Sequence, residues 1–318
     1  MKFYAVITFI LLVFVIPCIL FSQLENNLTS DNSSIESSVT LIQEPEFTVC
    51  VQQSDEYINM PIDEYVASVL LGEMPASFEM EALMAQAVAI RTYTLRRMLG
   101  SNKHATNALC TDPGCCQAFA MLSSGADSQR MVDAAQRTAG EVLLYEGEFV
   151  EATYFSCSGG YTEAALEVWG MDVPYLQAQP SPGEESARVY ETTVTIPMET
   201  FAQQLGITPV STIDEILRTS GGGVKTIWIG GREFSGLQLR KILGLRSTSF
   251  NIQIQDDQVV ITTKGFGHRV GMSQYGAEAM AISGSTYKEI LAYYYPGTDH
   301  VKMSTVELHA VFDKAGIL

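Results

Sequence analysis

The feature that most constrains this chain is an uncharged apolar run over residues 4–21, YAVITFILLVFVIPCILF. A helix of this length, rising about 1.5 Å per residue, nearly spans the ~30 Å hydrocarbon core of a bilayer. Lys2 precedes the run and an acidic stretch follows it, so the basic end is expected to stay in the cytoplasm. We therefore expect residues 1–22 to be a single transmembrane anchor in the cell membrane, with the rest of the chain extracytoplasmic.

A cleavable signal peptide is the alternative to an anchor. The run is long for a signal peptide, however, and no Ala-x-Ala-like cleavage site follows it. Cys18 makes a poor lipoprotein site, because Pro17 stands where a small residue is required. Residues 23–45 are rich in Ser, Asn and Glu and lack an apolar period, which predicts a flexible linker to a folded part that begins near residue 46.

The charge of the chain excludes one class of partner. There are 36 acidic against 19 basic residues, a formal net charge of -17, while 47% of the residues are hydrophobic. Such a composition is typical of a globular protein. A strongly acidic surface repels phosphate backbones, so we expect no nucleic acid among the partners.

Strand and helix patterns interleave irregularly from residue 46 onward, which predicts an α+β fold rather than a doubly wound sheet. Pro75 forces a break between the first two helices. The expected elements of residues 46–189 are a strand from 46, helices over 61–74, 79–99 and about 128–138, and a hairpin over 141–156 that turns at Glu146-Gly147.

The pattern changes over residues 190–258, which we interpret as a smaller α/β domain inserted into the core. The core would then consist of residues 46–189, completed by 259–318. Within the insert we expect a strand over 190–196, helices over 198–206 and 212–220, a triple-glycine turn and a strand over 224–230. After it, a Gly-rich turn leads to a helix, and a last helix is stopped by Pro296 and Gly297.

Glu73 is a lone glutamate directly before a Met-Pro break, in LLGEMP. Its neighbours Leu70, Leu71, Met74 and Phe78 could form a partly apolar wall that raises the pKa of a carboxyl group. A carboxyl with a raised pKa can protonate the leaving oxygen of a glycosidic bond. The alternative is an ordinary solvated glutamate at a helix end.

Four blocks of the chain together resemble the stage II sporulation protein D (SpoIID) family of lytic transglycosylases. The blocks are LLGEMP, ALMAQAVAIRTY, YFSCSGGYTEAALEVW and GFGHRVGMSQYGA, and the resemblance extends over about residues 46–305. It implies a SpoIID-like catalytic core that cleaves the MurNAc–GlcNAc linkages of denuded peptidoglycan glycan strands without water, leaving 1,6-anhydro-MurNAc ends. The catalytic glutamate of the family falls on Glu73.

The resemblance also implies a setting and partners. The family acts in sporulation engulfment, on the mother-cell side of the engulfing septum. Its implied partners are glycan strands already stripped of stem peptides, a sporulation amidase/endopeptidase, and a membrane scaffold protein of the engulfment complex. The N-terminal helix would hold the enzyme at the membrane.

Gln86 and Arg91 fall where the family has substrate-contacting Gln and Arg residues. A guanidinium suits the lactyl carboxylate that MurNAc keeps after its peptide is removed. The alternative for both is a polar helix face. Met84 replaces a Lys that is usual in the family, which bears on substrate preference.

In YFSCSGG, the resemblance implies that Ser156 offers a hydroxyl and Gly160 a close backbone approach to the sugar chain. Phe155 and Cys157 stand where the family has His and Thr. The alternative for this block is a bulged turn after a hairpin.

In GFGHRVGMSQYGA, we expect Gln274 and Tyr275 to be sugar contacts and Ser273 to cap the following helix. His268 is either a structural histidine or a residue of the substrate groove. Arg269 replaces a Gly of the family pattern. The block lacks the P-loop Lys-Ser and the dinucleotide-binding glycine spacing, so it does not predict phosphate binding.

A cysteine-rich loop is the last candidate site, in KHATNALCTDPGCCQAF. Thiolates and an imidazole suit a structural zinc site, which clostridial members of the family carry here. An exported chain could instead form disulfides, although adjacent cysteines pair badly with each other. The expected ligands are His104, Cys110 and Cys116, with Cys115 as the fourth or with water or another side chain in its place.

Two other functions compete with the transglycosylase. One is a non-catalytic module that binds cell wall or enhances an amidase, since relatives of this domain include amidase enhancers. The other is a secreted zinc hydrolase, which the absence of His-Glu-x-x-His spacing disfavours.

Overall fold

The computed structural model describes residues 46–53, 56–100, 104, 108–207 and 212–317. The predicted anchor at 1–22 and linker at 23–45 lie outside these residues. Among the residues that are described, no helix is both long and apolar enough to cross a membrane.

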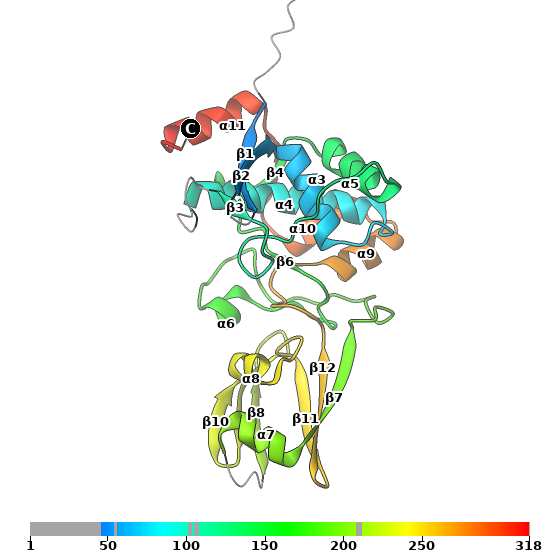
Figure 1. The fold of residues 1–318 in the computed structure, drawn as a ribbon, viewed down its shortest axis with the longest axis vertical. Coiled ribbons are helices and arrows are strands. Elements are labelled where there is room, and N and C mark those ends of the chain that lie inside the picture. Colours follow the sequence, from blue (N-terminus) through cyan, green and yellow to red (C-terminus); the bar gives the residue numbers. More distant parts are fainter. Residues whose placement is uncertain (1–45, 54–55, 101–103, 105–107, 208–211, 318) are drawn as a thin grey trace, which may run out of the picture. The chain divides into compact units, whose positions relative to one another are not determined.

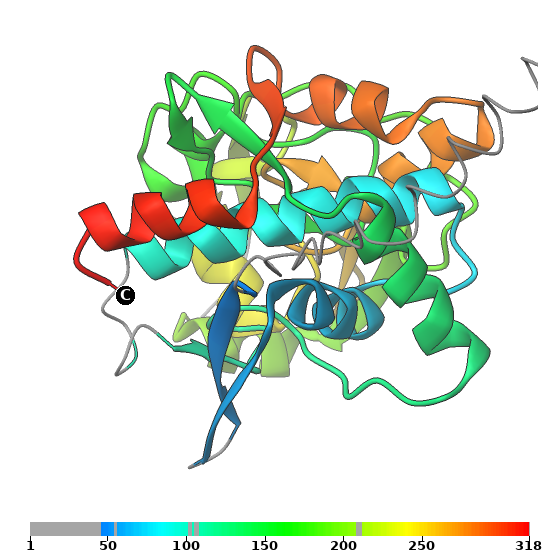
Figure 2. The same cartoon turned by 90° about the horizontal axis from the view of Figure 1, so that it is seen from above.

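Helix α4 (Met80–Gly100) is the centre of the main hydrophobic core. Its sequence ALMAQAVAIR is rich in alanine, so neighbouring backbones approach it closely, and most of its residues are buried. A helix that is apolar on nearly every side is expected to be enclosed. Figure 2 shows helices on both sides of α4. Those that pack on it are α3 (Ile62–Glu73), α5 (Ala126–Arg137), α9 (Gln274–Ile282) and α10 (Tyr287–Tyr294).

Small sheets surround this helical core. The predicted turn is confirmed, because Glu146 and Gly147 both adopt positive φ angles, 53° and 84°, as a type I′ turn requires. The hairpin is shorter than expected, since its second strand ends at Phe149 and not near residue 156. β6 (Tyr154–Phe155) pairs in parallel with β13 (Met272–Ser273) and joins two of the sequence blocks. The other two sheets are β2 (Glu56–Pro61), β1 (Thr48–Gln53) and β3 (Leu109–Cys110), and β14 (Asp299–Lys302), β4 (Glu141–Tyr145) and β5 (Glu148–Phe149).

A second hydrophobic cluster forms from residues between Phe201 and Ile261. Figure 1 shows its elements gathered together, away from α4. The cluster includes Val259 and Ile261, and so extends past the predicted boundary at residue 258. Its elements are β7 (Glu191–Pro197), α7 (Met198–Leu205), β8 (Ile213–Arg218), β9 (Val224–Ile229), β10 (Arg232–Ser235), α8 (Gly236–Leu243), β11 (Phe250–Gln255) and β12 (Gln258–Lys264).

The predicted helix over 212–220 is wrong, because the structure has strand β8 there. Ile213 pairs with Ile229 while Ile216 pairs with Ile227, so β8 carries one extra residue as a bulge. A bulge puts residues three apart on the same face of a strand, which imitates the spacing of a helix.

The helix that we expected to be the last, α10, is followed by β14 and by α11 (Thr305–Lys314). Ser304 and Glu307 form a capping box at the start of α11. Phe312 of α11 packs edge-on against Phe47, so the end of the described chain joins the main core.

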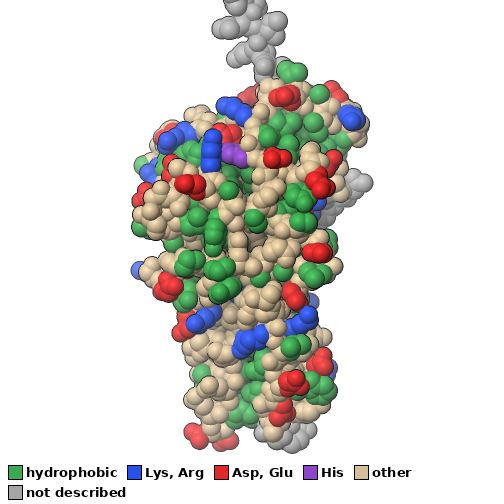
Figure 3. Space-filling model, turned by 180° about the vertical axis from the view of Figure 1, so that it is seen from behind, with side chains coloured by type: hydrophobic (Ala, Val, Ile, Leu, Met, Phe, Trp, Pro, Cys, Tyr) green, Lys and Arg blue, Asp and Glu red, His purple; other side chains and the backbone are tan. Residues whose placement is uncertain are grey.

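The fold is therefore a mixed α+β structure with several small sheets, as predicted. The division into core, insert and core completion stays a prediction. Figure 3 shows acidic side chains spread over one face rather than gathered into a patch.

Candidate active site

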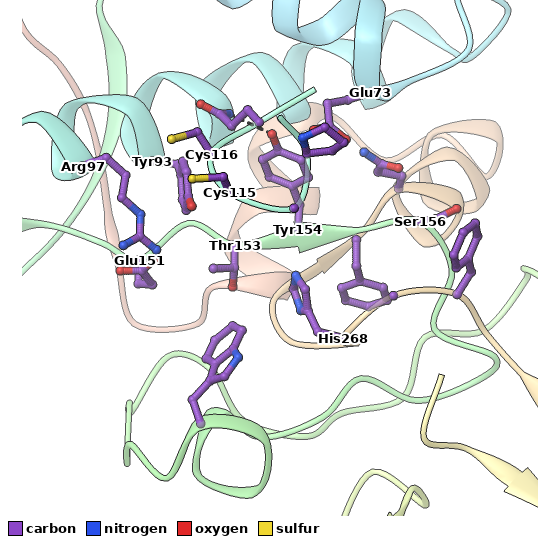
Figure 4. Close-up of a pocket in the computed structure, with 18 of the residues that line it drawn as sticks. Glu73, Tyr93, Arg97, Cys115, Cys116, Glu151, Thr153, Tyr154, Ser156 and His268 are labelled. Atoms are coloured by element: carbon purple, nitrogen blue, oxygen red, sulfur yellow. Dashed lines mark hydrogen bonds and ion pairs between the residues drawn. The ribbon is translucent and has the colours of Figure 1, made fainter. Parts of the chain in front are cut away.

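A pocket of about 960 Å³ brings together residues of all four sequence blocks. Figure 4 shows side chains from several elements that converge on it. Its lining residues are Glu73, Tyr93, Arg97, 113–117, Glu151, 153–156, Trp169, Met171, 266–268 and Gln274.

Glu73 is the last residue of helix α3. Met74 leaves the helix with φ −128° and ψ 145°, and its N–H donates to the Leu70 carbonyl at 3.0 Å. This extended conformation is the one that a following proline imposes, here Pro75. The Met-Pro break therefore sets where α3 ends, and with it the position of the Glu73 carboxyl at the pocket wall.

The Glu73 carboxyl lies in a partly buried environment that disfavours its charge. Burial raises the pKa of Glu73, while the Ala118 N–H, the Gln274 side chain and the Tyr154 hydroxyl oppose that rise by hydrogen bonding. The Ala118 N–H donates to Oε1 at 2.8 Å. A carboxyl group with a raised pKa retains its proton to higher pH than a solvated one, as a general acid must.

Gly72 lets the loop that follows the cysteines approach the end of α3. A Cβ at Gly72 would lie only 2.9 Å from the backbone nitrogen of Phe119. Because no side chain is present, Ala118 reaches Glu73, and the Ala120 N–H donates to the Ser68 carbonyl at 3.0 Å.

Tyr154 connects this loop to β6. Its buried hydroxyl accepts a hydrogen bond from Gln117 Nε2 at 2.8 Å, and burial holds the pKa of Tyr154 well above its ordinary value. Gln117 Oε1 accepts in turn from the Thr94 hydroxyl at 3.0 Å and the Tyr65 hydroxyl at 3.3 Å. The neutral Tyr154 hydroxyl is thus fixed beside Glu73.

The four predicted metal ligands come together at the pocket, and two of them, Cys115 and Cys116, line it. One ligand atom from each of His104, Cys110, Cys115 and Cys116 lies within 4.8 Å of the others. The two vicinal thiols lie 3.3 and 3.5 Å from His104 Nε2. None of the cysteines that the structure describes forms a disulfide. One imidazole and three thiols make a donor set that fits a soft metal ion.

Ser156, His268 and Gln274 also line the pocket, together with Glu73. His268 packs against Phe155 and Trp169, with ring centroids 5.7 and 5.3 Å away, so it is both a packed and a pocket residue. Burial, with a smaller contribution from the Arg240 charge, lowers the pKa of His268 to about 4. The imidazole is therefore neutral near pH 7.

Arg91 lies outside the pocket, and its predicted contact with substrate does not fit the structure. The side chain is fully buried, and its guanidinium donates to Asp63 at 2.6 Å and to the carbonyls of Ala135 and Glu141 at 3.0 and 3.3 Å. These interactions occupy the guanidinium, which gives Arg91 a structural role.

Gln86, Gly160 and Tyr275 also lie outside the pocket lining. Gln86 is fully buried in α4, and its amide atoms have no hydrogen-bond partner among the residues described. Gly160 adopts φ 110°, and its N–H donates to the Ser158 hydroxyl. Tyr275 packs edge-on against Phe78 at 5.1 Å. The buried position of Gln86 does not fit a sugar contact, whereas Gly160 and Tyr275 are partly exposed and their expected contacts stay predictions.

The sequence reasoning missed Tyr93, Arg97, Glu151, Trp169 and Phe266. Tyr93 and Arg97 are four residues apart on α4, a spacing that places them on one face, and the guanidinium lies 4.7 Å from the Tyr93 ring centroid. In Figure 4 the Arg97–Glu151 pair lies beside Tyr93, at the other end of the view from Glu73. Two signals were available: this i, i+4 spacing, and the position of Tyr93, Trp169 and Phe266 inside the sequence blocks.

Arg269 has a structural role that explains its departure from the family pattern. Its φ of 68° is one that glycine adopts readily, and its side chain is 1% exposed. The guanidinium reaches Glu163 at 3.3 Å, the Ser158 and Tyr161 carbonyls at 2.8 Å, and the Gly221 carbonyl at 2.6 Å. Arg269 therefore connects the loop that contains His268 to the glycine turn at Gly221, which lies at the edge of the second cluster.

Comparisons with known proteins agree with these sequence blocks. A family model described as "SpoIID: Stage II sporulation protein" matches residues 52–145. The chain is 38% identical over 257 residues to the stage II sporulation protein D of Bacillus subtilis (strain 168), covering 76% of this chain and 74% of that protein. It is similarly 38% identical over 255 residues to that of Bacillus amyloliquefaciens. An amidase enhancer of Bacillus subtilis is 30% identical over 287 residues, covering 72% of this chain and 39% of the enhancer.

Proposed function

This chain belongs to the stage II sporulation protein D (SpoIID) family, and we propose that it is a lytic transglycosylase of peptidoglycan. The proposed substrate is the denuded glycan strand, and the bond cleaved is the MurNAc–GlcNAc linkage. The observation that carries the proposal is one protonatable carboxyl, Glu73, on the wall of a pocket that admits several sugar-sized groups.

The other lining carboxylate supports a mechanism with a single acid–base group. Glu151 is held by two arginines, Arg96 at 2.9 Å and Arg97 at 2.7 Å. Both of its carboxylate oxygens are engaged by guanidinium groups, so neither is free to attack the sugar. Hydrolytic glycosidases ordinarily need two carboxylates. A transglycosylase needs no second one, since the substrate's own C6 hydroxyl attacks.

The proposed reaction balances without water. Glu73 donates its proton to the glycosidic oxygen as the bond to MurNAc C1 breaks, and the GlcNAc chain leaves with a new hydroxyl group. The MurNAc C6 hydroxyl then bonds to C1, and its proton passes to the Glu73 carboxylate. The products are a 1,6-anhydro-MurNAc end and a regenerated acid. Tyr154 and Ala118 hold the carboxyl group in place throughout.

We assign zinc to the cluster of His104, Cys110, Cys115 and Cys116. Zinc bound there would supply a structural cross-link, because four protein ligands leave no open position for a reacting water. The cross-link would stabilise the loop whose next residues, Gln117 and Ala118, contact Tyr154 and Glu73. The same closed set argues against a zinc hydrolase.

The proposed setting follows from the family and the N-terminal sequence. Residues 1–22 would anchor the enzyme in the cell membrane and residues 23–45 would connect it to an extracytoplasmic catalytic part. On the mother-cell side of the septum, a sporulation amidase/endopeptidase would supply peptide-free glycan, and a membrane scaffold protein of the engulfment complex would hold the enzymes together.

Product analysis tests the proposed activity. Peptide-free glycan strands are incubated with wild-type protein, with Glu73→Gln and with Glu64→Gln, and the products are identified by mass spectrometry. Glu64 is a matched control, because it is an exposed glutamate on the same helix. We expect anhydro ends from the wild type and Glu64→Gln, and a loss of roughly 10²- to 10⁴-fold in Glu73→Gln. Full activity of Glu73→Gln would refute the role of Glu73.

A non-catalytic role is the alternative, favoured by the similarity to an amidase enhancer. An enhancer requires no acid at Glu73. If neither wild type nor Glu73→Gln cleaves glycan, while both stimulate an amidase on intact peptidoglycan equally, the enhancer function replaces the enzyme.

A further inference from the structure

The pocket exposes large apolar side chains that packing alone does not require. Trp169 is 37% exposed, Phe266 42% and Met171 51%, and all three line the pocket. Exposed apolar groups that gather in a concave site are characteristic of ligand contact. The proposed acid–base chemistry of Glu73 uses none of them.

Trp169 is held firmly although it is exposed. It ends the short helix α6 (Ala165–Trp169), where Gly170 adopts φ 72° and its N–H donates to the Leu166 carbonyl at 3.0 Å. The His268 ring packs against the indole, with centroids 5.3 Å apart. Glu167 of the same helix pairs with Lys225 of β9 at 2.9 Å. The indole is thus positioned in advance of any ligand.

Phe266 is supported in a similar way. Its N–H donates to the Cys157 carbonyl at 2.7 Å, and the Arg246 guanidinium lies 5.4 Å from its ring centroid. Each ring therefore has a packed neighbour and a remaining exposed part that faces the pocket. Arg246 and Lys225 both come from the region of the second hydrophobic cluster, which gives that region a part in shaping the pocket.

We propose that Trp169 and Phe266 form a stacking platform for pyranose rings of the glycan, an inference that rests on the proposed function. A pyranose presents C–H groups on its faces and hydroxyl groups around its edge. The C–H face matches an aromatic ring, which carries a partial negative charge on its face. Ser156, Thr153 and Gln274 line the same pocket and offer polar groups to the hydroxyl edge. This pairing of apolar rings with a polar border fits a sugar better than an apolar peptide or a lipid chain.

The tryptophans of the chain allow the proposal to be tested by fluorescence. The chain has two tryptophans, Trp169 and Trp228. Trp228 lies on β9, is 40% exposed and is outside the pocket lining, so it is a matched control. Binding of peptide-free GlcNAc–MurNAc oligosaccharide is measured in full-length protein carrying Glu73→Gln, which leaves the probe intact. In that background Trp228→Phe leaves Trp169 as the sole indole fluorophore.

We expect the oligosaccharide to shift the emission of the Trp228→Phe protein and to leave that of the Trp169→Phe protein unchanged. Trp169→Ala should raise the Kd about tenfold, and Trp169→Phe should retain most of the affinity, because it keeps an aromatic face. Trp228→Ala should leave the Kd unchanged. With Glu73 intact, Trp169→Ala should raise KM while kcat changes little. Thermal melting of each variant identifies any loss of folding.

Two results would overturn the inference, and they are distinguishable. If the wild type forms anhydro products but Trp169→Ala and Phe266→Ala change neither Kd nor KM, the platform is refuted and the enzyme assignment stands. If the wild type forms no product and the Glu73→Gln protein binds no glycan, the proposed function fails, and this inference fails with it.

Discussion

Glu73 is a common residue type in an unusual, partly buried environment. Its carboxyl group is held by an amide donor and two side chains, yet burial is the largest influence on it and raises its pKa. Of the predicted apolar wall, Leu70, Met74 and Phe78 are buried and Leu71 is partly buried, while none of the four lines the pocket beside Glu73. Sequence reasoning could not predict the Ala118 and Tyr154 contacts, which come from parts of the chain far from residue 73.

The raised pKa of Glu73 sets the direction of the pH dependence. The acid form is the one that protonates the leaving oxygen, and burial extends this form to pH values above the ordinary 4.5 of a glutamate. We expect kcat/KM to fall as pH rises through the raised pKa of Glu73. The pH profile of glycan cleavage checks this, and a rate that keeps rising with pH would assign Glu73 a base role in the first step.

Arg91 should affect stability rather than substrate binding. Arg91→Met leaves the Asp63 carboxylate and two backbone carbonyls without their donor, at an expected cost of about 2–4 kcal/mol in the free energy of unfolding. Asp63→Asn should cost less, because Asp63 is 36% exposed. Urea unfolding measures both. A tenfold rise in KM for Arg91→Met at unchanged stability would instead support the predicted contact between Arg91 and substrate.

At the scale of elements, Gly72 controls how closely the cysteine loop approaches α3. A methyl group at Gly72 meets Phe119 backbone nitrogen at 2.9 Å, so Gly72→Ala should displace the loop by a few tenths of an ångström. We expect a loss of about 1–3 kcal/mol in stability and roughly tenfold in activity, because Ala118 moves away from Glu73. Gly100→Ala is the control, with nothing within 4 Å of its added carbon. Equal effects of both substitutions would contradict this role.

Removing the metal should loosen the same loop. Chelation, or Cys110→Ser, is expected to lower Tm and glycan cleavage together, since metal binding to the folded site stabilises it by linkage. Metal content, Tm and product yield are measured on each sample, with Cys50→Ser as a control outside the cluster. A protein that contains no zinc as purified and melts unchanged after chelation would exclude the structural metal.

The features that were predicted well are those that local sequence rules determine. The break at Pro75 and the Glu146-Gly147 turn depend on local steric rules, and both were found. β8 was missed because its bulge depends on the partner strand β9, which no local pattern reveals. Among site residues, the four metal ligands lie close to one another as expected. Arg91 instead pairs with Asp63 of another helix, a contact that no local pattern reveals.

At the scale of the whole molecule, Arg269 joins the pocket loop to the second hydrophobic cluster. Arg269→Gly would relieve a backbone with φ 68°, a gain of about 1 kcal/mol. It would also leave Glu163, 1% exposed, without its cation, at a cost of about 3–5 kcal/mol. We expect a net loss of stability in denaturant unfolding, with partial recovery in Arg269→Gly combined with Glu163→Gln. A stable Arg269→Gly protein would show that the ion pair contributes little.

The Arg269–Glu163 pair has a consequence for the thermodynamics of glycan binding. Two segments that share only apolar contacts can shift relative to each other at little cost. A buried ion pair with several backbone partners has one favourable geometry. The loop that contains His268 therefore loses its conformational entropy when the chain folds, and not when a sugar binds. Binding at such a preorganised surface should show a small entropic penalty and little change in backbone dynamics, in contrast to a lid that orders around its ligand.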